Sequence, residues 1–101
     1  MKKFFLILYL SIFTTSVFTD EKMSLGLNVF NNKAMCGTCH TLKDAGSNGD
    51  IGPNLDMLKP QIAQIIYVVT NGIGVMQPWE NILSEEEIEA VAYYVFNSTS
   101  K

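Results

Sequence analysis

The sequence has few of the residues that would build a basic surface or several reactive sites. Its 101 residues include no arginine, seven lysines, two cysteines, one histidine and one tryptophan. The net charge at pH 7 is −3, and without Lys2 and Lys3 five lysines face ten acidic residues, which gives −5. So few positive charges leave no basic patch, and we expect no nucleic-acid partner. An acidic surface favours instead a protein partner with a basic docking face, whose association is sensitive to salt.

The N-terminus has the layout of an export signal. A basic start is followed by an almost wholly apolar run over residues 4–13 and then by hydroxyl residues at 14–16. This order predicts a secretory signal peptide over residues 1–19. No A-x-A triplet marks the cleavage site, and cleavage after Ser16 or after Thr19 fits the sequence.

An uncleaved N-terminal membrane anchor is the alternative to a cleaved signal. The apolar stretch 4–18 has 15 residues, fewer than the roughly 18–20 that span a bilayer. Either alternative places residues 20–101 on the outer face of a membrane. The sequence therefore predicts one periplasmic domain, joined to the membrane at most through an unprocessed N-terminus.

Both cysteines and the histidine lie within five consecutive residues, Cys36-Gly37-Thr38-Cys39-His40. C-x-x-C-H is the spacing of a c-type haem attachment site. Each cysteine sulfur adds to one haem vinyl group, and the imidazole of His40 can bind the iron axially. Two other interpretations are a redox dithiol, which favours a βαβ context that the neighbouring sequence lacks, and a structural zinc site, which needs a fourth ligand such as a carboxylate.

Two stretches in the first three quarters of the chain have the pattern of an α-helix. Residues 23–33 are weakly amphipathic, with Ser24 as the expected N-cap. Residues 59–71 place Pro60 in the first turn and Gly72 just past the end. This second helix has an apolar face at i, i+3, i+4 and i+7, which consists of Ile62, Ile65, Ile66 and Val69.

The last helix is predicted over residues 84–96. Ser84 and Glu87 have the spacing of a capping box. The apolar stripe consists of Ile88, Val91, Ala92 and Val95, with Tyr94 at its edge. The segments 41–54, 73–83 and 97–101 are polar or contain glycine and proline, and they are predicted to be irregular. An all-α domain of about 80 residues usually needs a cofactor, metal or disulfide for stability.

Together these motifs resemble the class I cytochromes c of the small bacterial type. The motifs occur in the family's order: the attachment motif 36–40, then Gly52-Pro53-Asn54-Leu55, Gly74-Val75-Met76-Gln77-Pro78-Trp79, and the opening of the last helix at 83–88. The resemblance implies a cytochrome c fold, with three main helices and loops around one covalently attached haem. It also implies that the first and last helices cross, with Gly26 and Phe30 meeting Tyr94.

The resemblance further implies the roles of single residues. The carbonyl of Pro53 would accept a hydrogen bond from the ring of His40, and Leu55 would pack on the haem. Met76 would be the sixth ligand, so that His40 and Met76 hold the iron of one haem c. Trp79 would hydrogen-bond a haem propionate or fill the core. The family commonly has proline directly after the methionine, whereas here Gln77 intervenes.

These expectations define a function. With both axial positions filled by protein, we expect a one-electron carrier between a donor and an acceptor redox protein in the periplasm, and not an enzyme. An alternative is the haem subunit of a periplasmic dehydrogenase, because residues 52–60 and 70–76 are similar to haem subunits of sulfite dehydrogenases. A haem ligand sensor or small peroxidase would need an open sixth position.

Overall fold

The computed structural model describes residues 17–101. Residues 17–28 form an α-helix that passes into the π-helical turn η1 (Val29–Lys33). The following elements are η2 (Cys36–Thr38), β1 (Thr41–Leu42), η3 (Lys43–Ala45), β2 (Ser47–Asn48), α2 (Leu55–Leu58), α3 (Ile62–Asn71) and α4 (Glu85–Thr99). The strands β1 and β2 are antiparallel. The predicted all-α cytochrome c architecture of three main helices is confirmed.

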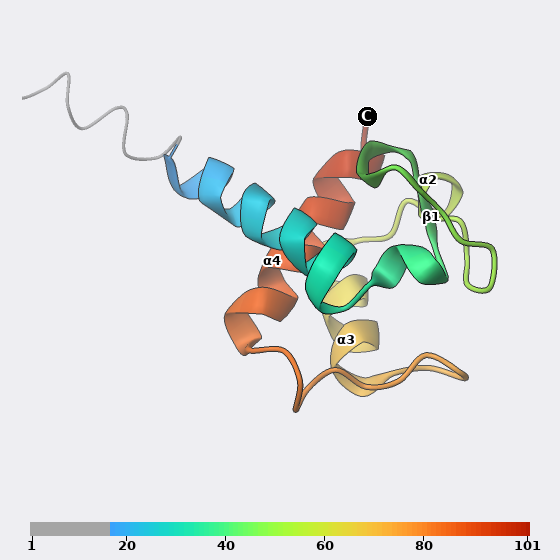
Figure 1. Ribbon diagram of the computed structural model, residues 1–101. Helices are drawn as coiled ribbons and strands as arrows, with labels where there is room; N and C mark the ends of the chain where they lie inside the picture. The colour runs from blue at the N-terminus through green and yellow to red at the C-terminus, as the bar shows by residue number, and fades with distance from the viewer. Residues whose placement is uncertain (1–16) are drawn as a thin grey trace, which may run out of the picture.

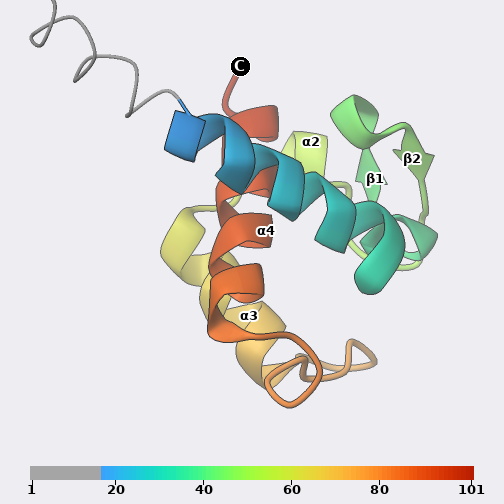
Figure 2. The same cartoon turned by 60° about the vertical axis from the view of Figure 1, so that its left-hand side comes forward.

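The N-terminal helix, residues 17–33 including η1, crosses α4 (Figures 1 and 2). Gly26 lies at the crossing, where an added Cβ would be only 2.2 Å from the carbonyl oxygen of Ala90 and 2.5 Å from Cβ of Tyr94. One turn later the ring of Phe30 packs on that of Tyr94, with centroids 6.1 Å apart and planes tilted by 56°. The expected contact of Gly26 and Phe30 with Tyr94 is therefore present, and glycine lets the two backbones approach.

The apolar faces of α3 and α4 form much of the core. Ile65 and Val69 of α3 are buried, and Ile62 and Ile66 are partly buried against the same cluster. All four residues of the predicted α4 stripe are buried. The helical period in the sequence therefore identified the packed faces of both helices.

The start of α4 has the predicted capping box. The Ser84 hydroxyl accepts from the Glu87 amide at 3.1 Å, and the Glu87 carboxylate accepts from the Ser84 amide at 2.8 Å. Lys33 adds an ion pair to the same carboxylate. The ion pair joins the end of the N-terminal helix to the first turn of α4, and it lowers the pKa of Glu87 together with the amide of Ser84.

Several predicted helix boundaries were wrong. Ser24 is not an N-cap, because residues 17–28 are continuously helical. Pro60 precedes α3, which begins at Ile62 after the N-cap Gln61. The last helix extends to Thr99, since Ser98 and Thr99 are buried rather than part of a polar tail.

Four short elements were also missed, three in the predicted irregular region and one after it. The segment 41–54 contains β1, η3 and β2, and the one-turn helix α2 follows it. Asn54 caps α2 by accepting from the Met57 amide at 3.2 Å. Of the predicted signal or anchor over residues 1–19, residues 1–16 lie outside the described part of the chain, and residues 17–19 belong to the N-terminal helix. No helix from residue 17 onward is long and apolar enough to cross a membrane.

Candidate cofactor site

The motif residues 36–40 form a tight turn. Met35 has a left-handed backbone, with φ of 50°, and directs the chain into η2. The amides of Cys39 and His40 both donate to the carbonyl of Cys36, at 3.1 and 3.0 Å. Both thiols are free and partly buried, and both line one cavity together with His40. The turn therefore presents two sulfurs and one imidazole to the same space.

The ring of His40 is oriented by the segment that follows the polar loop. Its Nδ1 donates to the carbonyl oxygen of Pro53 at 2.8 Å, and the amide of Gly52 donates to Cys39 O at 2.7 Å. An added Cβ on Gly52 would be 2.5 Å from Cε1 of the imidazole. Since a carbonyl oxygen can only accept a hydrogen bond, Nδ1 carries the proton, and Nε2 has a free lone pair.

A loop of residues 41–49, called here the buttress loop, packs against the back of the turn. The Thr41 hydroxyl donates to Gly49 O at 2.8 Å, which closes the loop on itself. An added Cβ on Gly49 would be 2.7 Å from Gly37 O and from His40 N, and one on Gly37 would be 2.5 Å from Cβ of Ser47. These close approaches explain why glycine stands at both positions, and they hold the loop directly on the attachment turn.

Met76 belongs to a compact turn between α3 and α4. The amide of Ile73 donates to Met76 O at 3.0 Å, and the amide of Met76 donates to Ile73 O at 2.9 Å. Gly72 and Gly74 have φ of 74° and 56°, which glycine adopts without strain. Trp79 ends the turn by donating its amide to Val69 O at 2.9 Å. The glycines therefore fold the turn back on α3 and bring Met76 and Trp79 to its packed side.

One cavity of about 540 Å³ joins these parts. All seven predicted site residues line it: Cys36, Cys39, His40, Pro53, Leu55, Met76 and Trp79. The volume is in the usual range for cofactor and ligand sites. Side chains of the N-terminal helix, α3 and α4 complete the wall, namely Phe30, Ile65, Val68, Val69, Val91 and Val95. Sequence reasoning assigned most of these to the core, because period 3.6 marks an apolar face without telling whether protein or cofactor covers it.

Comparisons with known proteins agree on the family. A family model described as cytochrome C oxidase, cbb3-type, subunit III, matches residues 21–95. The chain belongs to the c-type cytochromes. Cytochrome c6 of Tetradesmus obliquus is 34% identical over 88 residues, which cover 77% of this chain and 92% of that one. The crystal structure of the c-type cytochrome SorU from Sinorhizobium meliloti is similar with a TM-score of 0.76 and 46% identity, over 81% of this chain and 95% of SorU.

A longer relative also matches. The chloroplastic cytochrome c6 of Chlamydomonas reinhardtii is 38% identical over 88 residues, 77% of this chain and 55% of that protein, so this cytochrome spans about half of that relative's length. The expected resemblance to the small class I cytochromes c is confirmed. Haem c is accordingly the cofactor of this cytochrome, and single-electron transfer is its chemistry.

The site of the cytochrome fits that cofactor and does not favour the two non-haem interpretations. Burial raises the pKa of the Cys36 thiol to about 11 in the unmodified chain, whereas a redox dithiol needs a stabilised thiolate. Among the described residues no group of three or more His, Cys, Asp and Glu is arranged to hold a metal ion, as a structural zinc site requires. The wide apolar cavity beside two thiols and a free Nε2 suits a flat macrocycle with a central iron.

Proposed function

We propose that this cytochrome carries one haem c, bonded through Cys36 and Cys39 and ligated by His40 and Met76, and that it shuttles electrons between two redox proteins in the periplasm. The bound haem iron would cycle between Fe(III) and Fe(II) by taking up and giving up one electron. The observation that supports the proposal is that Cys36, Cys39, His40 and Met76 all line the same cavity.

The residues have separable tasks in this proposal. Pro53 fixes the protonated Nδ1 of His40, so that Nε2 is the ligand atom. The paired backbone of Ile73 and Met76 holds the methionine in a fixed turn, so its sulfur needs little rearrangement between redox states. Leu55 and Trp79 contribute apolar surface to the wall of the cavity. With His40 and Met76 both bound to the iron, no position would remain for a small ligand, which would favour electron transfer.

A second candidate is the haem subunit of a periplasmic dehydrogenase, such as a sulfite-oxidising enzyme. The similarity of residues 52–60 and 70–76 to such subunits favours it. The native mass of the protein from its own cells separates the two candidates. A single chain of about the mass of the cytochrome supports the free carrier, and co-purification with a molybdenum or quinoprotein subunit supports the alternative.

The test of the leading proposal is the optical spectrum of the exported protein. We expect haem that resists acid–acetone extraction, sharp low-spin bands after reduction and a weak far-red band of Met–Fe(III) in the oxidised state. Met76→Ala should lose the far-red band and bind CO readily, while wild type binds CO poorly. Met57→Ala is the matched control, because Met57 is 80% exposed and should change neither property. A mutant and a wild type with equal CO binding would refute ligation by Met76.

A further inference from the structure

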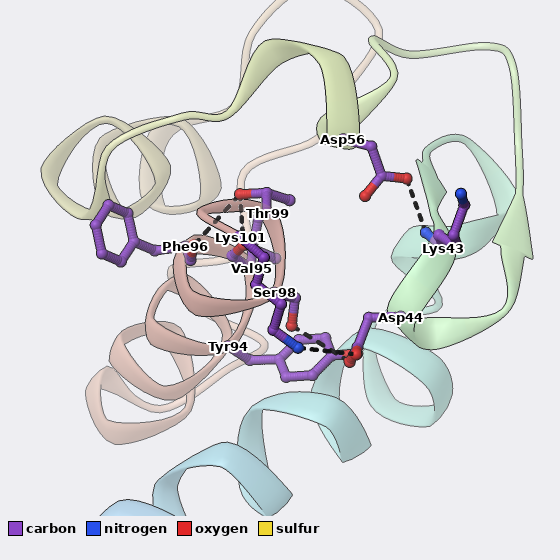
Figure 3. Close-up of polar contacts among 9 residues, drawn as sticks. All are labelled: Lys43, Asp44, Asp56, Tyr94, Val95, Phe96, Ser98, Thr99 and Lys101. Atoms are coloured by element: carbon purple, nitrogen blue, oxygen red, sulfur yellow. Dashed lines mark hydrogen bonds and ion pairs between the residues drawn. The ribbon is translucent and has the colours of Figure 1, made fainter.

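Asp44 connects the buttress loop to the last helix (Figure 3). Its Oδ2 accepts from the Tyr94 hydroxyl at 2.7 Å and from the Ser98 hydroxyl at 3.3 Å, and Lys101 Nζ lies 3.8 Å from Oδ1. Three side chains of the C-terminal part of the chain therefore converge on one carboxylate of η3. Asp44 is four residues after His40, on the segment that leaves the attachment turn.

Tyr94 is a fixed point for this contact. It is only 2% exposed, its ring packs on Phe30, and its Cβ lies against Gly26 at the helix crossing. Burial and the bond to Asp44 raise the pKa of the Tyr94 hydroxyl above its usual range, so the hydroxyl remains a donor. Tyr94 cannot follow the loop without disturbing the crossing of the two helices, so it is the loop that the bond restrains.

A displacement of the buttress loop would be transmitted to His40 through direct contacts. Leu42 of the loop is completely buried, and Gly49 at its other end packs on His40 N. A second bond supports the same loop, because the Lys43 amide donates to Asp56 Oδ2 of α2 at 2.8 Å. The α4 residues Val91 and Val95 line the same cavity as His40. Asp44 thus joins the segment beside His40 to α4, a helix that also lines the cavity.

We infer that Asp44 is a positioning residue: by holding the buttress loop to Tyr94 and Ser98, it fixes the orientation of the His40 imidazole relative to the haem. This inference rests on the proposed ligation by His40. It differs from the role of Pro53, which bonds the ring itself, because Asp44 acts through the backbone of the loop. A merely stabilising contact would change the free energy of unfolding and leave the orientation of the ligand unchanged.

The test compares Asp44→Ala, Asp44→Asn and Tyr94→Phe in the haem-loaded protein. The first readout is amide hydrogen exchange of residues 41–49. Losing a hydrogen bond to a charged acceptor should speed exchange there about tenfold or more in Asp44→Ala. The second readout is the pattern of haem-methyl NMR shifts in the ferric state, which depends on the plane of the axial imidazole. This pattern should change in Asp44→Ala and Tyr94→Phe, and less in Asp44→Asn, whose amide oxygen can still accept.

Asp50→Ala is the control for charge, because it removes a carboxylate from an exposed residue just beyond the loop. Its exchange rates and methyl shifts should match those of wild type. Wild-type values for Asp44→Ala in both readouts, or a loss of stability with unchanged methyl shifts, would overturn the inference. If Asp44→Ala does not accumulate with haem, Tyr94→Phe decides the case: wild-type methyl shifts in that variant overturn the inference. A wild-type spectrum without a low-spin histidine-ligated haem would instead refute the proposed function.

Discussion

The ring of His40 is held by a carbonyl thirteen residues away: Nδ1 donates to Pro53 O at 2.8 Å. The preceding residue, Gly52, makes this bond possible. Its backbone amide donates to Cys39 O at 2.7 Å, and its missing side chain leaves space for the imidazole. A Gly-Pro pair therefore serves two purposes here, since glycine admits the ring and proline presents the carbonyl that selects the tautomer.

Gly52→Ala should displace the imidazole. The new Cβ would lie 2.5 Å from Cε1 of His40, well inside van der Waals contact. We expect less haem per protein and a broadened or shifted low-spin spectrum in the fraction that does load, because the imidazole nitrogen that we propose as the iron ligand would be displaced. The ratio of reduced haem absorbance to protein absorbance measures this. Asp50→Ala is the control, since Asp50 is exposed and does not line the cavity; equal loading in the two variants would contradict the prediction.

Gly26→Ala should weaken the helix crossing. Alanine normally stabilises a helix interior by about 1 kcal/mol relative to glycine. Here the added Cβ would be 2.2 Å from a backbone oxygen of Ala90, which cannot move aside as a side chain can. Overpacking of this kind costs about 1–3 kcal/mol, so we expect a lower free energy of unfolding in urea. Asn31→Ala, on the exposed side of the same helix, is the control, and a Gly26→Ala protein more stable than wild type would show that the helices cross farther apart.

The sequence was sufficient for the parts of the site whose chemistry is local. The spacing of Cys36, Cys39 and His40 is enough to predict the haem attachment site. The helical period of apolar residues in α3 and α4 is enough to predict their packed faces. Met76 and Trp79 could be placed only through the resemblance to a family, because no local rule brings residue 76 to residue 40. The structure brings all of them around one cavity.

The features that the sequence did not reveal depend on tertiary contacts. The sequence predicted a polar tail at Ser98 and Thr99. In the structure both residues are buried and belong to α4, and the Thr99 hydroxyl donates a hydrogen bond to Val95 O within the helix. Lys59 Nζ also donates to Thr99 O at 2.7 Å and satisfies a carbonyl at the end of the helix. Likewise Asp44 has an ordinary turn composition around it, and nothing near it in sequence indicates a bond to Tyr94 fifty residues later.

Stability should fall in acid partly because of Glu87. The hydrogen bond from Lys33, and then that from the Ser84 amide, lower the pKa of Glu87 in the folded protein. A lowered carboxyl pKa contributes stability that is complete above the unfolded pKa and is lost as pH falls through the folded pKa. The free energy of unfolding of the reduced protein should therefore decrease below about pH 5, and less steeply in Glu87→Gln. Glu86→Gln, exposed in the same turn, is the control; parallel pH profiles for Glu87→Gln and wild type would refute the contribution.

The excess of acidic residues should affect the rates of electron transfer to small charged complexes, which can be measured without knowing the natural partner. From residue 17 onward five lysines face ten acidic residues, so the potential around the protein is negative at neutral pH. Oxidation by a cationic cobalt phenanthroline complex should slow as ionic strength rises, because salt screens the attraction. Oxidation by ferricyanide should accelerate over the same range, because salt screens the repulsion. The opposite pair of slopes in stopped-flow measurements would mean that the electron leaves through a locally positive surface, and it would exclude a basic docking face on the partner.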